Sequence, residues 1–355
     1  MLDGVGPILA RRLIAYSGGV EAVFKQKKQA LLKVPGVGAA IADKILKQDV
    51  MKRAEAELVF MEKNQIESLY FLDENYPRRL KELDDSPILI FCKGKMDLNA
   101  QRIISIVGTR KATDYGKMIT EKIVEGLAPF QPLILSGLAY GIDVVAHRAA
   151  LSHSLQTVGV VGHGLDMLYP SQHKSVSEKM MHNGGVISAY ASRTKLDPSN
   201  FPDRNRVVAS MTDAVVVIEA SKTGGALITA NLANEYNRDV MAVPGRANDI
   251  YSEGCNSLIK RTKAHLVESA EDVCYILGWE LDGISGKKSV QKQLFIDLTS
   301  DEQKLADLLQ SEGTLNIDII SIKSGFTLSQ SSSTLFGLEM KGVVKSMPGA
   351  KYALT

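Results

Sequence analysis

Several features that mark other protein classes are missing from this sequence. It has three cysteines in 355 residues, and no two of them form a CxxC pair, which argues against a disulfide framework and against a zinc site. No apolar run approaches the ~18 residues that a membrane span needs. The N-terminus also lacks the basic, apolar and small-residue order of a signal peptide. We therefore expect a cytoplasmic protein with no metal ion and no membrane partner.

The net charge is also small, and the common nucleotide-binding loops are missing. The formal net charge is +2, so any affinity for nucleic acid must come from local clusters of cations. No GxGxxG follows the first strand of the expected sheet, and no GxxxxGK[ST] occurs, which excludes the usual dinucleotide and ATP loops. No serine or cysteine stands at a nucleophile elbow. We expect no cofactor and no catalytic residues.

The middle of the chain alternates apolar β-branched runs with amphipathic stretches. This alternation predicts an α/β fold with an extended, Rossmann-like, doubly wound sheet. Strands are expected near 103–107, 132–136, 157–161, 185–189, 214–219 and 239–243. Helices are expected near 114–127, 142–151, 171–183, 203–211, 226–237 and 269–277.

Two of these strands lead into short segments that combine small residues with one cationic side chain. Strand and segment together span 104–110 and 215–226. The carboxyl ends of parallel strands form the ligand crevice of such a sheet, and helix N-termini face it. A further glycine-bounded turn, residues 136–143, follows another strand. A crevice with free amides and cations suits phosphate. Its candidate residues are Gly108, Thr109, Arg110, Ser136, Gly137, Lys222, Thr223, Gly224 and Gly225.

The segment from Ser192 to Arg206 interleaves cations with an aromatic ring and amides. Single-strand binders use cations along the backbone and aromatic faces for stacking, which is worth ~1–3 kcal/mol per base. We therefore add Phe201, Arg204, Asn205 and Arg206 to the DNA-binding candidates, with Phe201 as the stacking face. The alternatives are a solvated loop anchored by Phe201, and a structural pairing role for Arg204 or Arg206.

Two histidines near these turns are interpreted as structural. Asp143 and His147 lie four residues apart on one expected helix face, which predicts a pair that braces the loop. His163 has no clear ligand partner and is interpreted as a loop histidine.

The flanking regions predict two smaller domains. Residues 1–80 are expected to be an all-helical, SAM-like domain with helix-hairpin-helix turns at 4–7 and 35–38, which either hold a DNA phosphate or only pack the domain. Residues 81–279 form the Rossmann-like domain and 280–297 a linker. Residues 298–355 predict three helices and a β hairpin, a winged helix. Its helix 328–340 offers few groups that read a major groove. The winged-helix domain is therefore predicted either to dock a protein or to read DNA.

Seven motifs in one order and spacing resemble the DNA-processing protein A (DprA/Smf) family, and the two flanking domains are similar to family members as well. The sequence departs from the family pattern at Ala189, where Glu is usual, and at Thr262-Lys263, where Gly-Ala is usual. It also begins almost at its first hairpin turn, so a shortened helical domain is expected. The motifs are Val107-Gly108-Thr109-Arg110, Ser136 through Asp143, Ala146-His147, Gly164-Leu165-Asp166 with Tyr169-Pro170, Phe201 through Arg206, Val243-Pro244-Gly245 and Gly254 through Ile259.

The resemblance implies a function for the crevice. It implies a protein that binds single-stranded DNA, forms a homodimer and helps load the RecA recombinase during natural transformation and homologous recombination. Its partners would be single-stranded DNA, RecA and a second copy of the chain. It implies a DNA-binding mediator and not an enzyme.

One enzymatic alternative uses the same kind of sheet. The Gly224-Gly225 strand end also resembles the phosphoribohydrolases of the lysine-decarboxylase-like group, which cleave nucleoside monophosphates with an acid about six residues after the glycine pair. Asn231 stands at that position, and an amide cannot act as a general base. Glu219 is the only nearby substitute. A nicotinamide oxidoreductase is disfavoured by the missing fingerprint.

Overall fold

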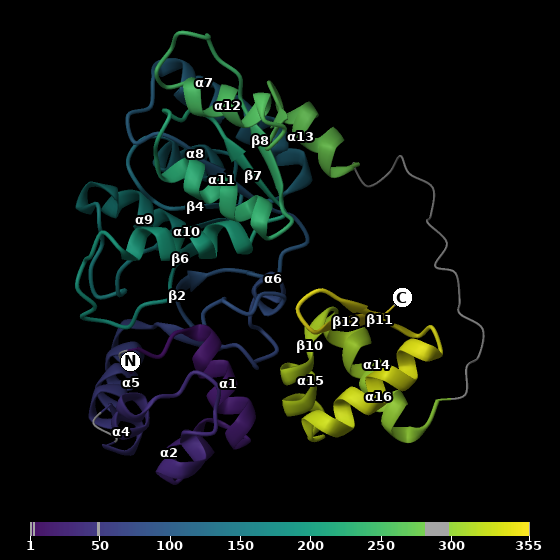
Figure 1. Cartoon of the computed structure of the whole chain (residues 1–355). Helices are drawn as coiled ribbons and strands as arrows, with labels where there is room; N and C mark the ends of the chain where they lie inside the picture. The colour runs from purple at the N-terminus through teal and green to yellow at the C-terminus, as the bar shows by residue number, and fades with distance from the viewer. Residues whose placement is uncertain (1, 3, 48–49, 281–297, 355) are drawn as a thin grey trace. The chain divides into compact units, whose positions relative to one another are not determined.

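The structure, a computed structural model, describes residues 2, 4–47, 50–280 and 298–354 (Figure 1). The predicted linker, 280–297, therefore lies outside the described residues except for its first position. The described chain divides into two compact units. The smaller unit holds residues 70–88, the helices before residue 57 and the C-terminal domain. The larger unit holds residues 57–69 and the sheet domain that begins at residue 89.

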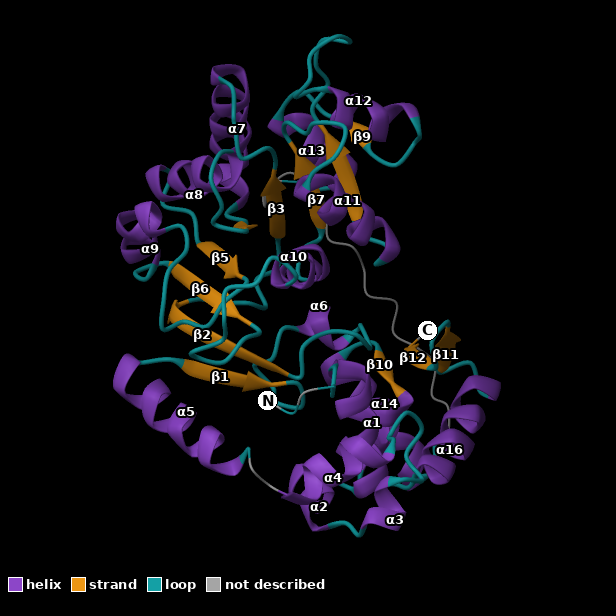
Figure 2. Cartoon of the chain, turned by 60° about the vertical axis from the view of Figure 1, so that its left-hand side comes forward, coloured by secondary structure: helices purple, strands orange, loops and turns teal. Residues whose placement is uncertain are grey.

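A mixed sheet, nine-stranded in the part of the chain that the structure describes, forms the centre of the larger unit (orange in Figure 2). Its strand order is β1-β2-β6-β5-β4-β3-β7-β8-β9. From β6 to β9 all neighbouring strands are parallel, whereas β2 runs antiparallel to β6. The strands are β1 Glu67–Tyr70, β2 Leu89–Lys95, β3 Ile103–Val107, β4 Leu133–Ser136, β5 Thr157–Val161, β6 Gly184–Ser188, β7 Ala214–Val217, β8 Asp239–Ala242 and β9 His265–Leu266.

Burial explains why the central segments are strands. Every residue of β3, β4, β5 and β7 is buried. Such continuous apolar runs are typical of parallel strands that helices cover on both faces. The main core joins β3, β4, β7 and β8 to α7, α8 and α13 through residues such as Ile104, Ile123 and Val273. The helices between and after the strands are α7 Asp114–Leu127, α8 Ile142–Ser152, α9 Lys174–Met180, α10 Asn200–Ser210, α11 Gly225–Glu235, α12 Glu253–Lys260 and α13 Ala270–Leu277.

The predicted doubly wound sheet is confirmed, and its six predicted strands are all present with small shifts at their ends. The predicted helices are present too, although 171–183 divides into a 3-10 turn, Ser171–His173, and α9. Helix α12 was not predicted, because its run contains a glycine and small polar residues. The all-helical prediction for residues 1–80 is wrong at β1, since a four-residue strand is stabilised by its sheet neighbour and leaves little local pattern.

The connections of the sheet diverge between β3 and β7. The chain proceeds from β3 through β4, β5 and β6 on one side, and then crosses to β7 on the other side of β3. Neighbouring strands with diverging connections leave a crevice at their carboxyl ends. Residues 108–110 follow β3 and residues 218–224 follow β7, so the fold brings the two predicted strand ends together.

The N-terminal part of the smaller unit consists of short helices. They are α1 Pro7–Ser17, α2 Val20–Lys25, α3 Lys28–Leu31, α4 Ala39–Lys47 and α6 Arg78–Lys81, and α5 Met51–Asn64 passes from this unit to the larger one. Gly4 (φ +87°) and Gly36 (φ +92°) adopt left-handed backbone shortly before α1 and α4. Glycine is suited to that conformation. Both predicted hairpin turns thus lead into helices. No described helix is long and apolar enough to cross a bilayer.

The C-terminal domain has the predicted winged-helix elements. Its helices are α14 Ser300–Glu312, α15 Ile317–Ser324 and α16 Leu328–Met340, with strands β10 Leu315–Asn316, β11 Val344–Met347 and β12 Lys351–Leu354. Thr299 and Glu302 form the capping box of α14. The exposed positions of α16 include Phe336 and Met340, 63% and 74% exposed, while its Gln330 accepts a hydrogen bond from the Thr327 amide in the capping box of the helix.

Glu312, at the end of α14, links two lysines within the smaller unit. Its carboxylate accepts hydrogen bonds from Lys81 Nζ at 3.3 Å and from Lys323 Nζ at 2.5 Å, and the three side chains are largely buried. Burial alone would raise the pKa of Glu312. The hydrogen bond from Lys323 and the charge of Lys81 outweigh burial and hold this pKa below its ordinary value.

Replacing Glu312 by glutamine is expected to lower the free energy of unfolding by about 3 kcal/mol, because two buried ammonium groups lose their counter-charge. Since the pKa of Glu312 is lower in the folded state, its contribution is full above the ordinary carboxyl pKa of ~4.3 and is lost as the pH falls through the lower folded value. Urea unfolding at neutral pH and at about pH 3 measures both effects. The control is Glu21→Gln, which removes an exposed pair with Lys25. Equal midpoints for the two variants at neutral pH would contradict the prediction.

Candidate functional site

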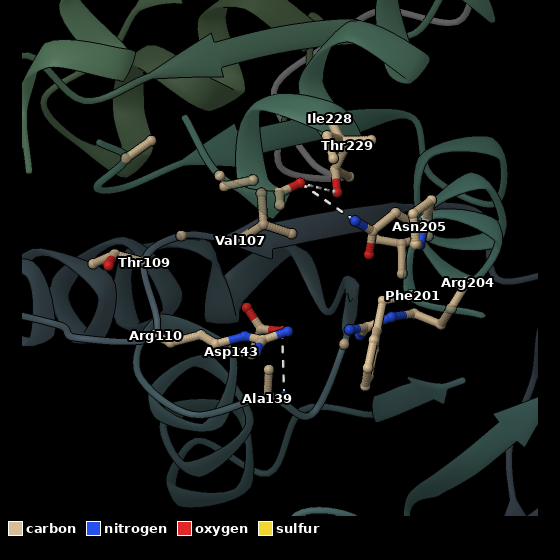
Figure 3. Close-up of a pocket in the computed structure, with 18 of the residues that line it drawn as sticks. Val107, Thr109, Arg110, Ala139, Asp143, Phe201, Arg204, Asn205, Ile228 and Thr229 are labelled. Atoms are coloured by element: carbon tan, nitrogen blue, oxygen red, sulfur yellow. Dashed lines mark hydrogen bonds between the residues drawn. The ribbon is translucent and has the colours of Figure 1, made fainter. Parts of the chain in front are cut away.

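A pocket of about 330 Å³ lies where β3, β7 and the N-terminus of α11 meet (Figure 3). Its walls come from four segments that are far apart in the sequence: the loop after β3, the turn from β4 into α8, α10, and the loop from β7 into α11. Most of the predicted binding residues line it. They are Gly108, Thr109, Arg110, Gly137, Phe201, Arg204, Asn205, Thr223, Gly224 and Gly225.

Ser136, Arg206 and Lys222 do not line this pocket. Ser136 is buried, and its Oγ donates to the Ile106 carbonyl at 2.6 Å. Arg206 is exposed and pairs with Asp203, because residues two apart on a helix point in nearly opposite directions and Arg204 faces the pocket. Lys222 lines a separate groove together with residues of α12, including Lys260, and with Arg261, which follows that helix.

The glycines around the pocket are of two kinds, and the first kind is required by the fold. A Cβ on Gly137 would lie 1.5 Å from Nη1 of Arg204 and 2.6 Å from Oδ2 of Asp143. A Cβ on Gly108 would lie 2.4 Å from Cγ1 of Ile142. Real Cβ atoms do not come this close to other heavy atoms. At these two positions a side chain would displace neighbouring protein atoms.

Gly224 and Gly225 are of the second kind. A Cβ on Gly224 would have Ser221 Oγ as its nearest neighbour at 3.9 Å, and one on Gly225 would have Asn205 Nδ2 at 3.7 Å, both ordinary contacts. Neither residue has the left-handed backbone that favours glycine. The fold would therefore accept a side chain here, and what glycine provides is open backbone at the N-terminus of α11. The amides of a helix's first turn have no partner inside the helix and attract anions.

Two guanidinium groups line the pocket. Figure 3 shows Arg110 and Arg204 extending toward each other from opposite sides. Their Cζ atoms lie 5.4 and 5.9 Å from the ring centroid of Phe201. Arg110 is exposed, whereas Arg204 is only 6% exposed. The Phe201 ring is thus held by cations, so a base that stacked on it would have to share it with them.

The hydrogen-bonding capacity of the Arg204 guanidinium is only partly used. Its Nη1 donates to the Val160 carbonyl at 3.2 Å, while its buried Nε has no hydrogen-bond partner. Burial lowers the pKa of Arg204 and the charge of Arg110 adds to this, whereas the nearby Asp143 opposes it. Burial likewise raises the pKa of Asp143, partly offset by Arg204 and by the amide of Ala139. Two guanidinium groups therefore face a single carboxylate, and an anion entering the pocket would restore the balance.

The predicted Asp143–His147 pair is wrong. His147 is fully buried, and its Nδ1 lies 2.7 Å from Oγ1 of Thr157, while its Nε2 has no partner. Burial lowers the pKa of His147 to about 3, so the ring is neutral. His163 has the structural role expected of it, because Nδ1 contacts the Gly164 carbonyl and Nε2 accepts from the amide of Tyr169.

The two residues weighed for the enzymatic alternative are engaged elsewhere. The Glu219 carboxylate accepts from the amide and the hydroxyl of Thr113, the N-cap of α7, at 3.0 and 2.5 Å. Asn231 donates to the Leu227 carbonyl and accepts from Lys263 Nζ at 3.1 Å. Neither side chain lines the pocket. Glu219 therefore holds the loop after β3 in place, and no carboxylate stands where a phosphoribohydrolase needs its base.

The loop between β6 and α10 is anchored by a carboxylate that the sequence analysis missed. Glu57 on α5 is 3% exposed and accepts from the amide of Ser192 at 2.9 Å and from its hydroxyl at 2.6 Å. A buried carboxylate is costly without such donors, so these bonds fix the loop that precedes Phe201. The two residues are 135 positions apart, which leaves no local signal in the sequence.

Comparison with sequence models of protein families assigns the chain to one family. The sequence model described as DNA recombination-mediator protein A matches residues 67–278, more than half of the chain, and that of the DprA winged helix domain matches residues 293–350. The chain belongs to this family. The resemblance carried by the motifs is thereby confirmed. The family consists of DNA-binding recombination mediators and not of enzymes.

Individual members of the DprA family match most of the chain. Protein Smf of Synechocystis sp. is 32% identical and the match covers 99% of this chain and 96% of the relative. The DNA processing protein DprA of Streptococcus pneumoniae is 35% identical, over 71% of this chain and 95% of its own. The X-ray structure of the S. pneumoniae protein has a TM-score of 0.66 at 32% identity, covering 77% of this chain and 93% of that one.

A second solved structure concerns the ligand. It describes a unique single-stranded DNA binding mode of DNA processing protein A from Helicobacter pylori. Its TM-score is 0.55 at 29% identity, and the match covers 60% of this chain and 95% of that one.

Proposed function

We propose that this DprA family member binds single-stranded DNA in the pocket between β3, β7 and α11, and that it helps load the RecA recombinase onto that DNA as a homodimer, in natural transformation and homologous recombination. The observation that carries the proposal is the pairing of Arg110 and Arg204 with the open N-terminus of α11 around one cavity. Both groups attract phosphate.

The shape of the pocket favours a single strand over a duplex. A base in a duplex is stacked and paired, so it enters a recessed pocket only after its pair has opened. A nucleotide of a single strand carries no such cost. The H. pylori relative, with its described single-stranded DNA binding mode, supports this choice of ligand.

Fluorescence anisotropy of a labelled oligonucleotide, single-stranded and duplex, tests the DNA-binding part. We expect the single strand to bind at least about tenfold more tightly, a difference of ~1.4 kcal/mol. Its affinity should fall with salt, with a slope of about −0.7 per phosphate contact. Equal binding of the duplex, or binding that is insensitive to salt, would reject the proposed pocket.

The recombinase part is tested separately. The protein is expected to speed the assembly of RecA filaments on single-stranded DNA that is covered by a single-strand-binding protein. An unchanged assembly rate would remove RecA from the proposal and leave DNA binding in place.

Light scattering tests the homodimer, which should have twice the chain mass of 38.6 kDa. Two linked pockets would raise affinity for a long strand through effective concentration.

Incubation with AMP is expected to release no ribose 5-phosphate. The reason is the engagement of Glu219 with Thr113 and the amide at Asn231, which leave no free carboxylate at the position where a phosphoribohydrolase has its general base. Chromatographic detection of free adenine over several hours is the measurement, with an authentic phosphoribohydrolase as positive control. Release that disappears in the Glu219→Gln variant would support the enzymatic alternative instead.

A further inference from the structure

We propose that the pocket is a site for one nucleotide that carries a terminal 5′-phosphate, so that nucleoside 5′-monophosphates and 5′-phosphorylated DNA ends bind it better than an internal nucleotide does. This inference rests on the proposed function, because it concerns the same pocket. It adds which part of a DNA strand, and which small molecules, the pocket prefers.

The phosphate end of the site is the start of α11. This helix has eleven residues, and Gly224 is its N-cap. The Gly225 carbonyl accepts from Asn205 Nδ2 at 3.3 Å and from Thr229 Oγ1 at 3.1 Å, which fixes the first turn (Figure 3). The fold itself would accept a Cβ at Gly224 and Gly225, as described above. The space that the two glycines leave open is therefore available to a ligand that approaches the backbone closely.

A second and independent feature points to the same ligand. Arg204 lines the pocket, is more than nine-tenths buried, and has an Nε without a partner. A buried donor without an acceptor is costly, and a phosphate oxygen supplies a charged acceptor. Arg110 lies across the pocket and repels Arg204, since its charge lowers the Arg204 pKa. An anion between the two guanidinium groups would relieve both effects.

The amount of charge selects the kind of phosphate. A terminal phosphate carries a charge of about −1.5 to −2 at neutral pH, whereas the phosphodiester inside a strand carries −1. The pocket offers two guanidinium groups and a helix N-terminus against the single carboxylate of Asp143. The helix end alone is equivalent to roughly half a positive charge. A terminal phosphate, which carries more negative charge, is therefore stabilised more by this excess of positive charge than a phosphodiester is.

The volume of the whole pocket suits one nucleotide. A pocket of about 330 Å³ is at the small end of the ~300–1,000 Å³ range of ligand sites. It therefore has room for one nucleotide and not for two stacked ones. Its lining also includes the apolar side chains of Val107, Val208 and Ile228. These side chains give the sugar or the base a surface to cover.

The experiment is a competition against a single-stranded oligonucleotide with a 5′-hydroxyl and a 3′ label, followed by anisotropy. The competitors are dTMP, AMP, thymidine and inorganic phosphate. We expect the two monophosphates to displace the oligonucleotide at millimolar concentration or below, thymidine not to displace it, and phosphate to be at least about tenfold weaker than the monophosphates. The same oligonucleotide with a 5′-phosphate should bind about fivefold more tightly than its 5′-hydroxyl form.

A variant links these effects to the start of α11. Gly225→Ala should keep the wild-type unfolding midpoint, because the new methyl group meets no protein atom closely. It should also lose both competition by dTMP and the gain from the 5′-phosphate. Gly225→Val, with a larger side chain, should lose them as well, so the result does not depend on one substitution.

The outcomes separate this inference from the proposed function. Single-stranded DNA that binds in an Arg110-dependent manner, without competition by dTMP or AMP and without any 5′-phosphate effect, would overturn the inference and leave the proposed function standing. Phosphate that competes as well as the monophosphates would overturn it too, in favour of a plain anion site. Monophosphates and the 5′-phosphorylated oligonucleotide that bind while the 5′-hydroxyl oligonucleotide does not, with monophosphate binding measured directly by calorimetry, would support the inference and reject binding of internal nucleotides.

Discussion

Replacing Arg110 by alanine is expected to weaken binding of single-stranded DNA about tenfold at moderate salt, the effect of ~1.4 kcal/mol. Arg110 is the exposed one of the two guanidinium groups in the pocket, so a phosphate reaches it without any rearrangement of the core. The slope of the salt dependence should also fall by about 0.7, which corresponds to one lost phosphate contact on a single strand. Anisotropy titrations across a salt series measure both quantities.

The neighbouring cation Lys111 provides the matched control. It is exposed, adjacent in the sequence and outside the pocket lining. Lys111→Ala removes the same charge from nearly the same place and should reduce affinity only slightly. If Lys111→Ala and Arg110→Ala weakened binding equally, the loss would reflect general electrostatics and not the pocket.

Gly137→Ala is expected to cost about 3 kcal/mol in the free energy of unfolding and to abolish DNA binding. The new methyl group would lie 1.5 Å from Arg204 Nη1, so the guanidinium must move. Its movement removes the positive charge beside buried Asp143, and a buried charge that loses its partner is costly. Urea unfolding followed by circular dichroism measures the loss of stability, and anisotropy measures the loss of binding.

Gly225→Ala is the control for this substitution, because it makes the same chemical change on the other side of the pocket. Its methyl group would come no closer than 3.7 Å to a protein atom, so its unfolding midpoint should match that of the wild type. Identical midpoints for Gly137→Ala and Gly225→Ala would mean that Arg204 has room to shift, and the division of the glycines into two kinds would be wrong.

The pocket could be located from the sequence because its position follows from topology. The apolar run of β3 and that of β7 are local patterns, and each ends in a small-residue segment. In a doubly wound sheet, two neighbouring parallel strands whose connections run to opposite sides have their carboxyl ends next to each other. The segment around Phe201 was found by composition alone, and the structure places it at the same pocket.

The direction of each side chain was not predictable in the same way. Arg204 and Arg206 carry the same charge two positions apart, and only their placement on α10 turns one into the pocket and the other toward Asp203. Asp143 and His147 have a helical spacing that permits contact, yet the buried hydroxyl of Thr157 provides a better partner for the imidazole. These choices depend on which neighbouring element packs against the helix.

The sequence by itself determined the fold class, the family and the four segments that build the pocket, because apolar periodicity and motif order are properties of the chain alone. The tertiary structure alone decided which cations face the cavity, and that Gly137 makes room for Arg204 while Gly225 leaves room for a ligand. Two glycines look alike in a sequence because the difference between them lies in the atoms that surround an absent Cβ. Those atoms come from residues far away along the chain, and folding brings them together.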